Sequence, residues 1–206
     1  MKAILKEYFT GCLTIPNLLS LIRIALIPVF AVLFNDGSYL WAVIVLAISG
    51  LTDFFDGKIA RKFNQISALG KLLDPIADKL SQITIAVVFY LAFSNSSDET
   101  VKTFSWIFLI FLVKEAVMVV GGAIMIAFGL KPVAAEMPGK IATFAFYVIM
   151  CVIMAFGPDI GILGNVFTLP AAVMIALVCI SVVLTIIAFL SYMPGVFQQV
   201  KERSKK

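Results

Sequence analysis

The segment Ser49–Gln82, SGLTDFFDGKIARKFNQISALGKLLDPIADKLSQ, carries four aspartates within two otherwise apolar stretches. The chain around it is strongly apolar: 62% of its 206 residues are hydrophobic and only 14% are charged, and the mean hydropathy is +1.07. A soluble domain has about 25% charged residues, and a globule of this length could not bury so much apolar surface. The sequence therefore predicts an integral membrane protein in which these carboxylates have a functional reason.

Six apolar runs approach the length of about 20 residues that a membrane-spanning helix needs. The expected spans are Ile15–Phe34, Tyr39–Ile59, Leu69–Phe93, Thr103–Leu130, Pro138–Phe156 and Val166–Tyr192. Turn residues separate them, as in NDGS at residues 35–38. The prediction is one all-α, polytopic membrane domain with a short amphipathic interfacial helix at 1–14. A six-helix bundle at 15–192 and a solvated cytoplasmic tail at 193–206 complete it.

Basic residues are distributed unevenly between the two sides that these spans define. Eleven fall on one side: Lys2, Lys6, Lys58, Arg61, Lys62, Lys131, Lys140, Lys201, Arg203, Lys205 and Lys206. The other side has only Lys102, together with Asp36, Asp98, Glu99 and Asp159. Because cytoplasmic loops carry the excess of Lys and Arg, the termini and the aspartate segment are expected at the cytoplasmic face of the cell membrane.

The spacing of the aspartates places each pair on one face of a helix. The first face carries Asp53, Asp56, Gly57 and Ala60. The second face carries Gly70, Asp74 and Asp78. If the two helices pack side by side, four carboxylates meet in one pocket at the membrane edge. The small residues would leave room for a nucleotide or allow close helix packing.

Four carboxylates in a medium of low dielectric constant need countercharge. Oxygen ligands of this kind suit magnesium or manganese rather than zinc, and carboxylates shared between two metals are common where phosphoryl groups are transferred. The chain contains no histidine, so a carboxylate is the natural general base. A solvated helix–loop–helix would not explain the phasing of the carboxylates and small residues. A cation-coupled transporter is the alternative of another class, but its site would more often lie at the midplane of a repeat.

The fixed positions of this segment resemble a family signature. Asp53-x-x-Asp56-Gly57-x-x-Ala60-Arg61, eight residues, then Gly70-x-x-x-Asp74-x-x-x-Asp78 is similar at every fixed position to the signature of the CDP-alcohol phosphotransferases. The resemblance extends along most of the chain. It implies transfer of a phosphatidyl group from CDP-diacylglycerol to an alcohol, with release of CMP. It also implies two divalent metal ions, Mg²⁺ or Mn²⁺, and a homodimer in the lipid bilayer, with no nucleic-acid partner.

The same resemblance implies roles for individual residues. Asp53, Asp56 and Asp74 would bind metals, and Asp78 would bind one metal and act as the general base on the acceptor hydroxyl. Five residues would line the CMP and diphosphate site: Thr52, Gly57, Ala60, Arg61 and Gly70. The chemistry is consistent with this, because a hydroxyl has a pKa far above 7 and needs a base to attack phosphorus. Arg61 offers a planar fork of donors to a phosphate, although it could also be a cytoplasmic anchor.

Within the family the chain is most similar to the phosphatidylglycerophosphate synthases, whose acceptor is glycerol 3-phosphate. That anion would need cations, and Arg23, Lys114 and Lys140 are the candidates for binding it. Two departures weaken this assignment, and the alternative within the family is a cardiolipin synthase with phosphatidylglycerol as acceptor. Val113-Lys114-Glu115 stands where the first group usually has Ala-Arg-Glu. The segment GKIAT, residues 139–143, lacks a second lysine, as cardiolipin synthases also do. Two of these cations have an alternative, structural interpretation. Lys114 could form an ion pair with Glu115, and Lys140 could be an anchor at the membrane interface.

Overall fold

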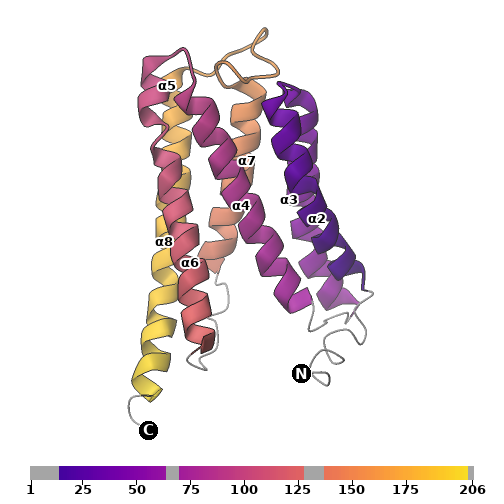
Figure 1. Cartoon of the computed structure of the whole chain (residues 1–206), viewed down its shortest axis with the longest axis vertical. Coiled ribbons are helices and arrows are strands. Elements are labelled where there is room, and N and C mark those ends of the chain that lie inside the picture. The colour runs from indigo at the N-terminus through magenta and orange to yellow at the C-terminus, as the bar shows by residue number, and fades with distance from the viewer. Residues whose placement is uncertain (1–13, 64–69, 128–136, 204–206) are drawn as a thin grey trace. The chain divides into compact units, whose positions relative to one another are not determined.

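The structure is a computed structural model, and it describes residues 14–63, 70–127 and 137–203. The side chains of residues 53–62, 71–72, 126–127, 200 and 202–203 also lie outside the description. All regular structure in the described part is helical (Figure 1). The helices are α2 (Ile15–Asn35), α3 (Tyr39–Lys62), α4 (Gly70–Ser94), α5 (Glu99–Phe104), α6 (Ile107–Ala127), α7 (Met137–Phe156) and α8 (Ala171–Arg203). The prediction of an all-α protein is confirmed, and the expected interfacial helix at 1–14 falls outside the described residues except for Thr14.

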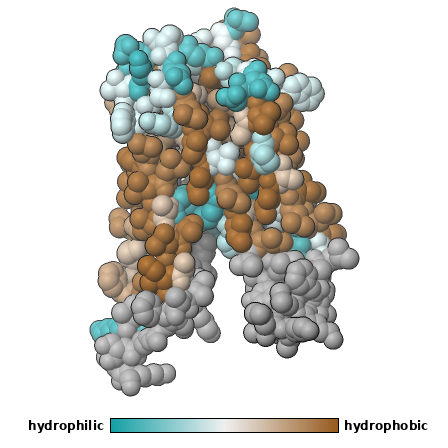
Figure 2. All heavy atoms as spheres, viewed as in Figure 1, coloured by the Kyte–Doolittle hydropathy of each residue, from teal (hydrophilic) through white to brown (hydrophobic). Residues whose placement is uncertain are grey.

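The described helices have the length and composition of membrane spans. Five stretches qualify: Ile15–Asn35, Leu73–Ser94, Glu99–Met125, Met137–Phe156 and Ala171–Gln199. The described apolar part of α3 is shorter, Tyr39–Thr52, and the charged residues follow it. Figure 2 shows apolar side chains covering much of the outer surface of the described helices. Exposed apolar surface on this scale requires lipid, so the chain is a polytopic all-α membrane protein.

The chain divides into two compact units, Met1–Val88 and Phe89–Lys206. In the first unit, α2 packs along α3. The turn between them is a Schellman motif, in which the N–H groups of Gly37 and Ser38 donate to Phe34 and Leu33. Gly37 has a φ of +73°, a left-handed conformation that glycine adopts without strain. This turn, predicted from NDGS, is short and returns the chain alongside α2.

The second unit is organised around aromatic side chains. The end of α4 meets α6 where the rings of Phe93 and Phe108 lie 5.0 Å apart, and α6 meets α7 where those of Phe111 and Phe146 lie 4.9 Å apart. α8 packs against α7, α6 and α5. At one end of this unit the hydroxyl of Ser96 donates to Asp159 across 2.5 Å and so joins two loops. The apolar runs of the sequence thus form a packed core here as well as a lipid-facing surface.

The structure differs from the sequence prediction most clearly in the bounds of the last helix and in one additional short helix. The last expected span was Val166–Tyr192, whereas α8 begins at Ala171, after Pro170, and continues through Pro194 to Arg203. Most of the segment expected as a solvated tail is therefore helical. The second difference is α5, which was not predicted. Asp98 begins it by accepting hydrogen bonds from the backbone N–H groups of Thr100 and Val101 at 2.8 and 3.3 Å, an N-cap that stabilises even a short helix.

Candidate functional site

The described part of the candidate site is built on the first turns of α4. Asp74 and Asp78 lie four residues apart on this helix, as their spacing predicted. The Asp74 side chain is 52% exposed and that of Asp78 is 24% exposed. Two carboxylates one turn apart, both reached by solvent, are available to bind a cation or accept a proton.

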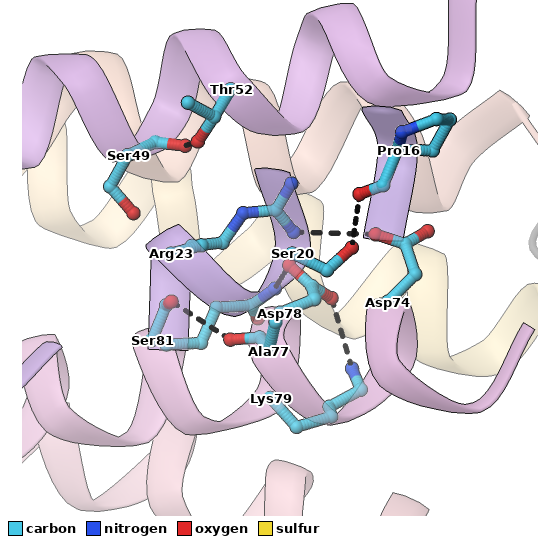
Figure 3. A network of polar contacts seen from close by, with 11 residues as sticks. Pro16, Ser20, Arg23, Ser49, Thr52, Asp74, Ala77, Asp78, Lys79 and Ser81 are labelled. Atoms are coloured by element: carbon cyan, nitrogen blue, oxygen red, sulfur yellow. Dashed lines mark hydrogen bonds and ion pairs between the residues drawn. The ribbon is translucent and has the colours of Figure 1, made fainter. Parts of the chain in front are cut away.

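Arg23 of α2 lies beside the first of these carboxylates. Its Nη1 is 3.4 Å from Oδ1 of Asp74, and the Arg23 side chain is completely buried. Figure 3 shows the guanidinium reaching from α2 to Asp74 on α4. A buried arginine is stable only with opposite charge nearby, so the carboxylate and the guanidinium stabilise each other. Arg23 therefore contacts a carboxylate of the protein, and its expected role at the acceptor phosphate stays a prediction.

Two side chains of the same helix lie beside the second carboxylate. Nε2 of Gln82 donates a 2.8 Å hydrogen bond to Oδ1 of Asp78. Nζ of Lys79 lies 3.9 Å from Oδ2 of the same carboxylate (Figure 3). The sequence analysis did not single out Gln82. The signal was nevertheless present, because residues four apart on a helix are neighbours and a Gln–Asp pair at that spacing forms a hydrogen bond.

The three helices of the first unit meet one to two turns away from the carboxylates. They jointly line a cavity of about 10 Å³, roughly the space of one water molecule. Its lining includes Ser49 of α3 and Ser81 of α4. Ser49 lies one helical turn before Asp53, and Ser81 lies three residues after Asp78. This meeting of α3 and α4 is the arrangement that the convergence of the two aspartate faces requires.

The remaining residues of the predicted pocket are described only in part. α3 is helical through residues 53–61, so the spacing argument holds for the backbone of Asp53, Asp56, Gly57, Ala60 and Arg61, whose side chains lie outside the described part. Gly70 is the first residue of α4. The hydroxyl of Thr52 donates to the backbone oxygen of Ser49 at 2.7 Å.

The carboxylates of α4 suit a hard divalent cation. Carboxylate oxygens are the ligands that magnesium and manganese prefer, and both side chains are partly exposed. Among the residues with described side chains, no three acidic, Cys or His side chains come together. A complete ligand set would therefore need Asp53 and Asp56 of α3 in addition to Asp74 and Asp78.

The other two expected acceptor residues lie in the second unit. Lys114 of α6 forms an ion pair with the adjacent Glu115, whose side chain is 2% exposed. Lys140 is exposed in the first turn of α7. It follows Gly139, where an added Cβ would lie 2.6 Å from the hydroxyl of Tyr192, so a larger residue there would have to displace the end of that side chain. The structural ion pair at Lys114 is thus observed, and an acceptor-binding role for either lysine stays a prediction.

Comparison with known proteins places the chain in a family. Residues 13–187 match the family model of the CDP-alcohol phosphatidyltransferases. The chain is 40% identical over 141 residues to a cardiolipin synthase (CMP-forming) of Streptomyces coelicolor, covering 64% of this chain and 60% of that protein. It is 33% identical over 114 residues to a CDP-diacylglycerol–glycerol-3-phosphate 3-phosphatidyltransferase of Aquifex aeolicus, covering 55% and 61%.

A third relative is the human cardiolipin synthase (CMP-forming), 53% identical over 68 residues, which are 32% of this chain and 23% of that protein. The chain thus spans at most about three fifths of the length of these relatives. The family model, in contrast, covers most of the chain and includes both α3 and α4. The chain belongs to the CDP-alcohol phosphatidyltransferase family.

Proposed function

We propose that the protein transfers the phosphatidyl group of CDP-diacylglycerol to phosphatidylglycerol, forming cardiolipin and CMP. The observation that carries the transfer is the carboxylate pair of α4, partly exposed and backed by the buried guanidinium of Arg23. In a family that uses CDP-activated lipids, such a pair is suited to bind the diphosphate through cations and to accept the proton of the attacking hydroxyl.

In the proposed reaction Asp78 accepts the proton of the acceptor hydroxyl. The hydroxyl oxygen forms a bond to the phosphorus of the phosphatidyl group, and the bond from that phosphorus to the oxygen bridging to CMP breaks. CMP leaves with the electron pair of the broken bond. Proton transfer to a positioned carboxylate typically contributes 10²–10⁴-fold to the rate.

Two divalent ions, Mg²⁺ or Mn²⁺, are part of the proposal. Asp53, Asp56, Asp74 and Asp78 would hold them, and the ions would neutralise negative charge on the diphosphate. Arg23 has a separate task. Its buried guanidinium lies 3.4 Å from Oδ1 of Asp74 and orients that carboxylate. Thr52, Gly57, Ala60, Arg61 and Gly70 stay our candidates for the nucleotide and diphosphate site.

Three observations support phosphatidylglycerol as the acceptor. The Streptomyces coelicolor relative is a cardiolipin synthase. Lys114, a candidate cation for a small phosphorylated acceptor, is engaged by Glu115. Ala142, the position that lacks the second lysine, is buried and supplies no charge. A lipid acceptor that carries a single negative charge needs fewer protein cations than glycerol 3-phosphate does.

Glycerol 3-phosphate is the second candidate acceptor. It is favoured by the Aquifex aeolicus relative, which is named for that acceptor. The exposed position of Lys140 in the first turn of α7 also favours it, because a cation there is accessible to a soluble anion. If this candidate is correct, Lys140→Ala should raise the KM for glycerol 3-phosphate about tenfold, a loss of roughly 1.4 kcal/mol.

The test is a competition between the two acceptors. Purified protein in detergent receives CDP-diacylglycerol, Mn²⁺, and equal concentrations of labelled phosphatidylglycerol and labelled glycerol 3-phosphate. We expect cardiolipin and CMP in equal amounts and little labelled phosphatidylglycerophosphate. Product from glycerol 3-phosphate alone would shift the assignment to the second candidate. No CMP with either acceptor, or with a wider panel of alcohols, would contradict the proposed transfer.

We further propose that the protein acts as a homodimer with its site at the cytoplasmic face of the cell membrane. The excess of basic residues near the aspartate segment supports this orientation. Single cysteines at Ser97 and Gly161, in a variant without native cysteines, should react with an impermeant reagent added outside. One at Ser204 should react only after the membrane is opened. The reverse pattern would contradict the orientation.

Mass measurement of the purified protein in detergent tests the proposed homodimer.

A further inference from the structure

The carboxylate of Asp78 accepts a hydrogen bond from the buried side-chain amide of Gln82. Gln82 lies one helical turn further along α4, is 7% exposed, and donates from Nε2 to Oδ1 of Asp78 at 2.8 Å. The Asp78 side chain itself is 24% exposed. The hydrogen bond therefore connects a partly exposed carboxylate to a group that is fixed inside the protein.

Gln82 is better placed than Lys79 to fix the direction of this carboxylate. Nζ of Lys79 is 3.9 Å from Oδ2, beyond normal hydrogen-bond length, and the Lys79 side chain is 25% exposed. A partly solvated lysine contributes little through such a contact. Leaving a buried carboxamide without a hydrogen bond destabilises the folded protein. The Gln82 amide is therefore expected to keep its hydrogen bond to Asp78. The short, buried contact with Gln82 therefore restrains the Asp78 side chain more than the contact with Lys79 does.

The chemistry of the donor also matters. An amide is neutral, so it orients Asp78 without adding a positive charge that would compete with a bound cation. Arg23 plays a different part at Asp74, where it supplies a full charge. Groups that hydrogen-bond to a metal ligand, without binding the metal themselves, fix the orientation of that ligand. Their loss typically lowers metal affinity or activity 10–100-fold.

We propose that Gln82 is a positioning residue that holds Asp78 in the orientation needed to bind a divalent cation and to accept the acceptor proton. The inference rests on the proposed function for the role of Asp78. It concerns a residue that lies outside the aspartate signature, and it follows from the hydrogen bond and the burial alone.

The test compares Gln82→Met with Ser81→Ala. Methionine keeps the length and the burial of glutamine and removes the donor. Ser81 is the neighbouring buried residue, and its hydroxyl donates to the backbone oxygen of Ala77 rather than to Asp78. Ser81→Ala therefore removes a buried hydrogen bond from the same turn of α4 and leaves the Gln82–Asp78 contact intact. Both variants are purified as the full chain in detergent, and their melting temperatures are measured alongside the parent.

Three quantities are measured: kcat, the KM for CDP-diacylglycerol, and the Mn²⁺ concentration that half-saturates the thermal stabilisation of the protein. For Gln82→Met we expect kcat to fall about tenfold and the half-saturating Mn²⁺ concentration to rise about tenfold. The KM for CDP-diacylglycerol should stay within about twofold of the parent, because the contact orients a reacting group. Ser81→Ala should match the parent in all three.

Two results would overturn the inference. One is a Gln82→Met protein whose kcat and Mn²⁺ dependence both stay within about twofold of the parent. The other is an equal loss of stability and activity in Gln82→Met and Ser81→Ala, which would indicate a structural role. If Gln82→Met does not fold, Gln82→Asn serves instead, since it keeps the amide and is one methylene too short to reach. A parent that makes no CMP but binds Mn²⁺ in a Gln82-dependent way would contradict the proposed function and leave the positioning role standing.

Discussion

The protein has a buried ion pair in each of its two units, and the two pairs are built in opposite ways. In the Arg23–Asp74 pair the cation is completely buried and the carboxylate is 52% exposed. In the Lys114–Glu115 pair the carboxylate is 2% exposed and the lysine is 16% exposed. The first pair joins two helices across 51 positions of sequence, and the second joins neighbours on α6.

This difference indicates that the Arg23–Asp74 pair belongs to the functional site and that the Lys114–Glu115 pair stabilises the fold. The Asp74 carboxylate is 52% exposed and is oriented by a buried guanidinium, so it is accessible and can bind a metal ion. The Glu115 carboxylate is 2% exposed and is paired with its neighbouring lysine, so it is much less accessible. We therefore expect changes to the first pair to affect the reaction, and changes to the second pair to affect the stability of the fold.

The largest effect is expected at the exposed carboxylate. Asp74→Asn should reduce CMP formation below detection, because it removes a negatively charged ligand and keeps the shape of the side chain. The melting temperature should also fall, because the completely buried Arg23 loses a countercharge. A phosphatidyltransferase assay and a melting curve on the same preparation measure both. Asp74→Asn protein with activity close to that of the parent would remove Asp74 from the site.

The next effect is on stability and comes from the second pair. Glu115→Gln should lower the free energy of unfolding by about 3 kcal/mol, because it removes the carboxylate beside a largely buried lysine. The double variant Lys114→Met/Glu115→Gln should regain most of that loss. Thermal unfolding in detergent measures both. If Lys114 binds the acceptor, the double variant will regain stability and show a raised acceptor KM, which would contradict the supporting role.

The buried arginine should give a smaller effect that falls on the reaction. Arg23→Met should lower kcat about 10–100-fold, because Asp74 loses the guanidinium that orients it. Stability should be nearly unchanged, since replacing a buried charge by an apolar side chain is often neutral. Arg23→Lys should recover part of the activity, because it restores the charge without the planar fork. A fall in stability without a fall in kcat would indicate that the Arg23–Asp74 pair, like the Lys114–Glu115 pair, has only a structural role.

The smallest effect is expected where α7 and α8 touch, outside both pairs. Gly139→Ala would bring a Cβ within 2.6 Å of the Tyr192 hydroxyl. The tip of a tyrosine can shift, so the loss of stability should be about 1 kcal/mol, at the low end for overpacking. Adding Tyr192→Phe should restore it by removing the hydroxyl. Lack of rescue would indicate that the contact with Tyr192 is not what requires glycine at residue 139.

Much of the fold could be predicted from sequence because its signals are local. Apolar runs and turn residues predicted the long helices, and the four-residue spacing of Asp74 and Asp78 predicted their shared face on α4. The extension of α8 beyond Tyr192 was missed, because the last span was predicted from its apolar run alone. α5 was missed because six residues leave no periodic pattern.

The sequence indicates which acidic residues are candidates for the site, but it shows only some of the contacts that these residues make. The Gln82–Asp78 contact is local and could have been read from the sequence. The Arg23–Asp74 contact could not, because it depends on how α2 packs against α4 across 51 positions. Charge alone suggested that Arg23 binds a phosphate. Only the packing reveals that Arg23 contacts a carboxylate of the protein.

The central claim is that the carboxylates of α3 and α4 form a metal-dependent site for phosphatidyl transfer. It is tested most directly by measuring CMP release from CDP-diacylglycerol, with phosphatidylglycerol as acceptor, in protein stripped with EDTA and then titrated with Mn²⁺. We predict no CMP release in EDTA, recovery as Mn²⁺ is added, and no recovery in Asp74→Asn. CMP release that continues at full rate in EDTA would contradict the account.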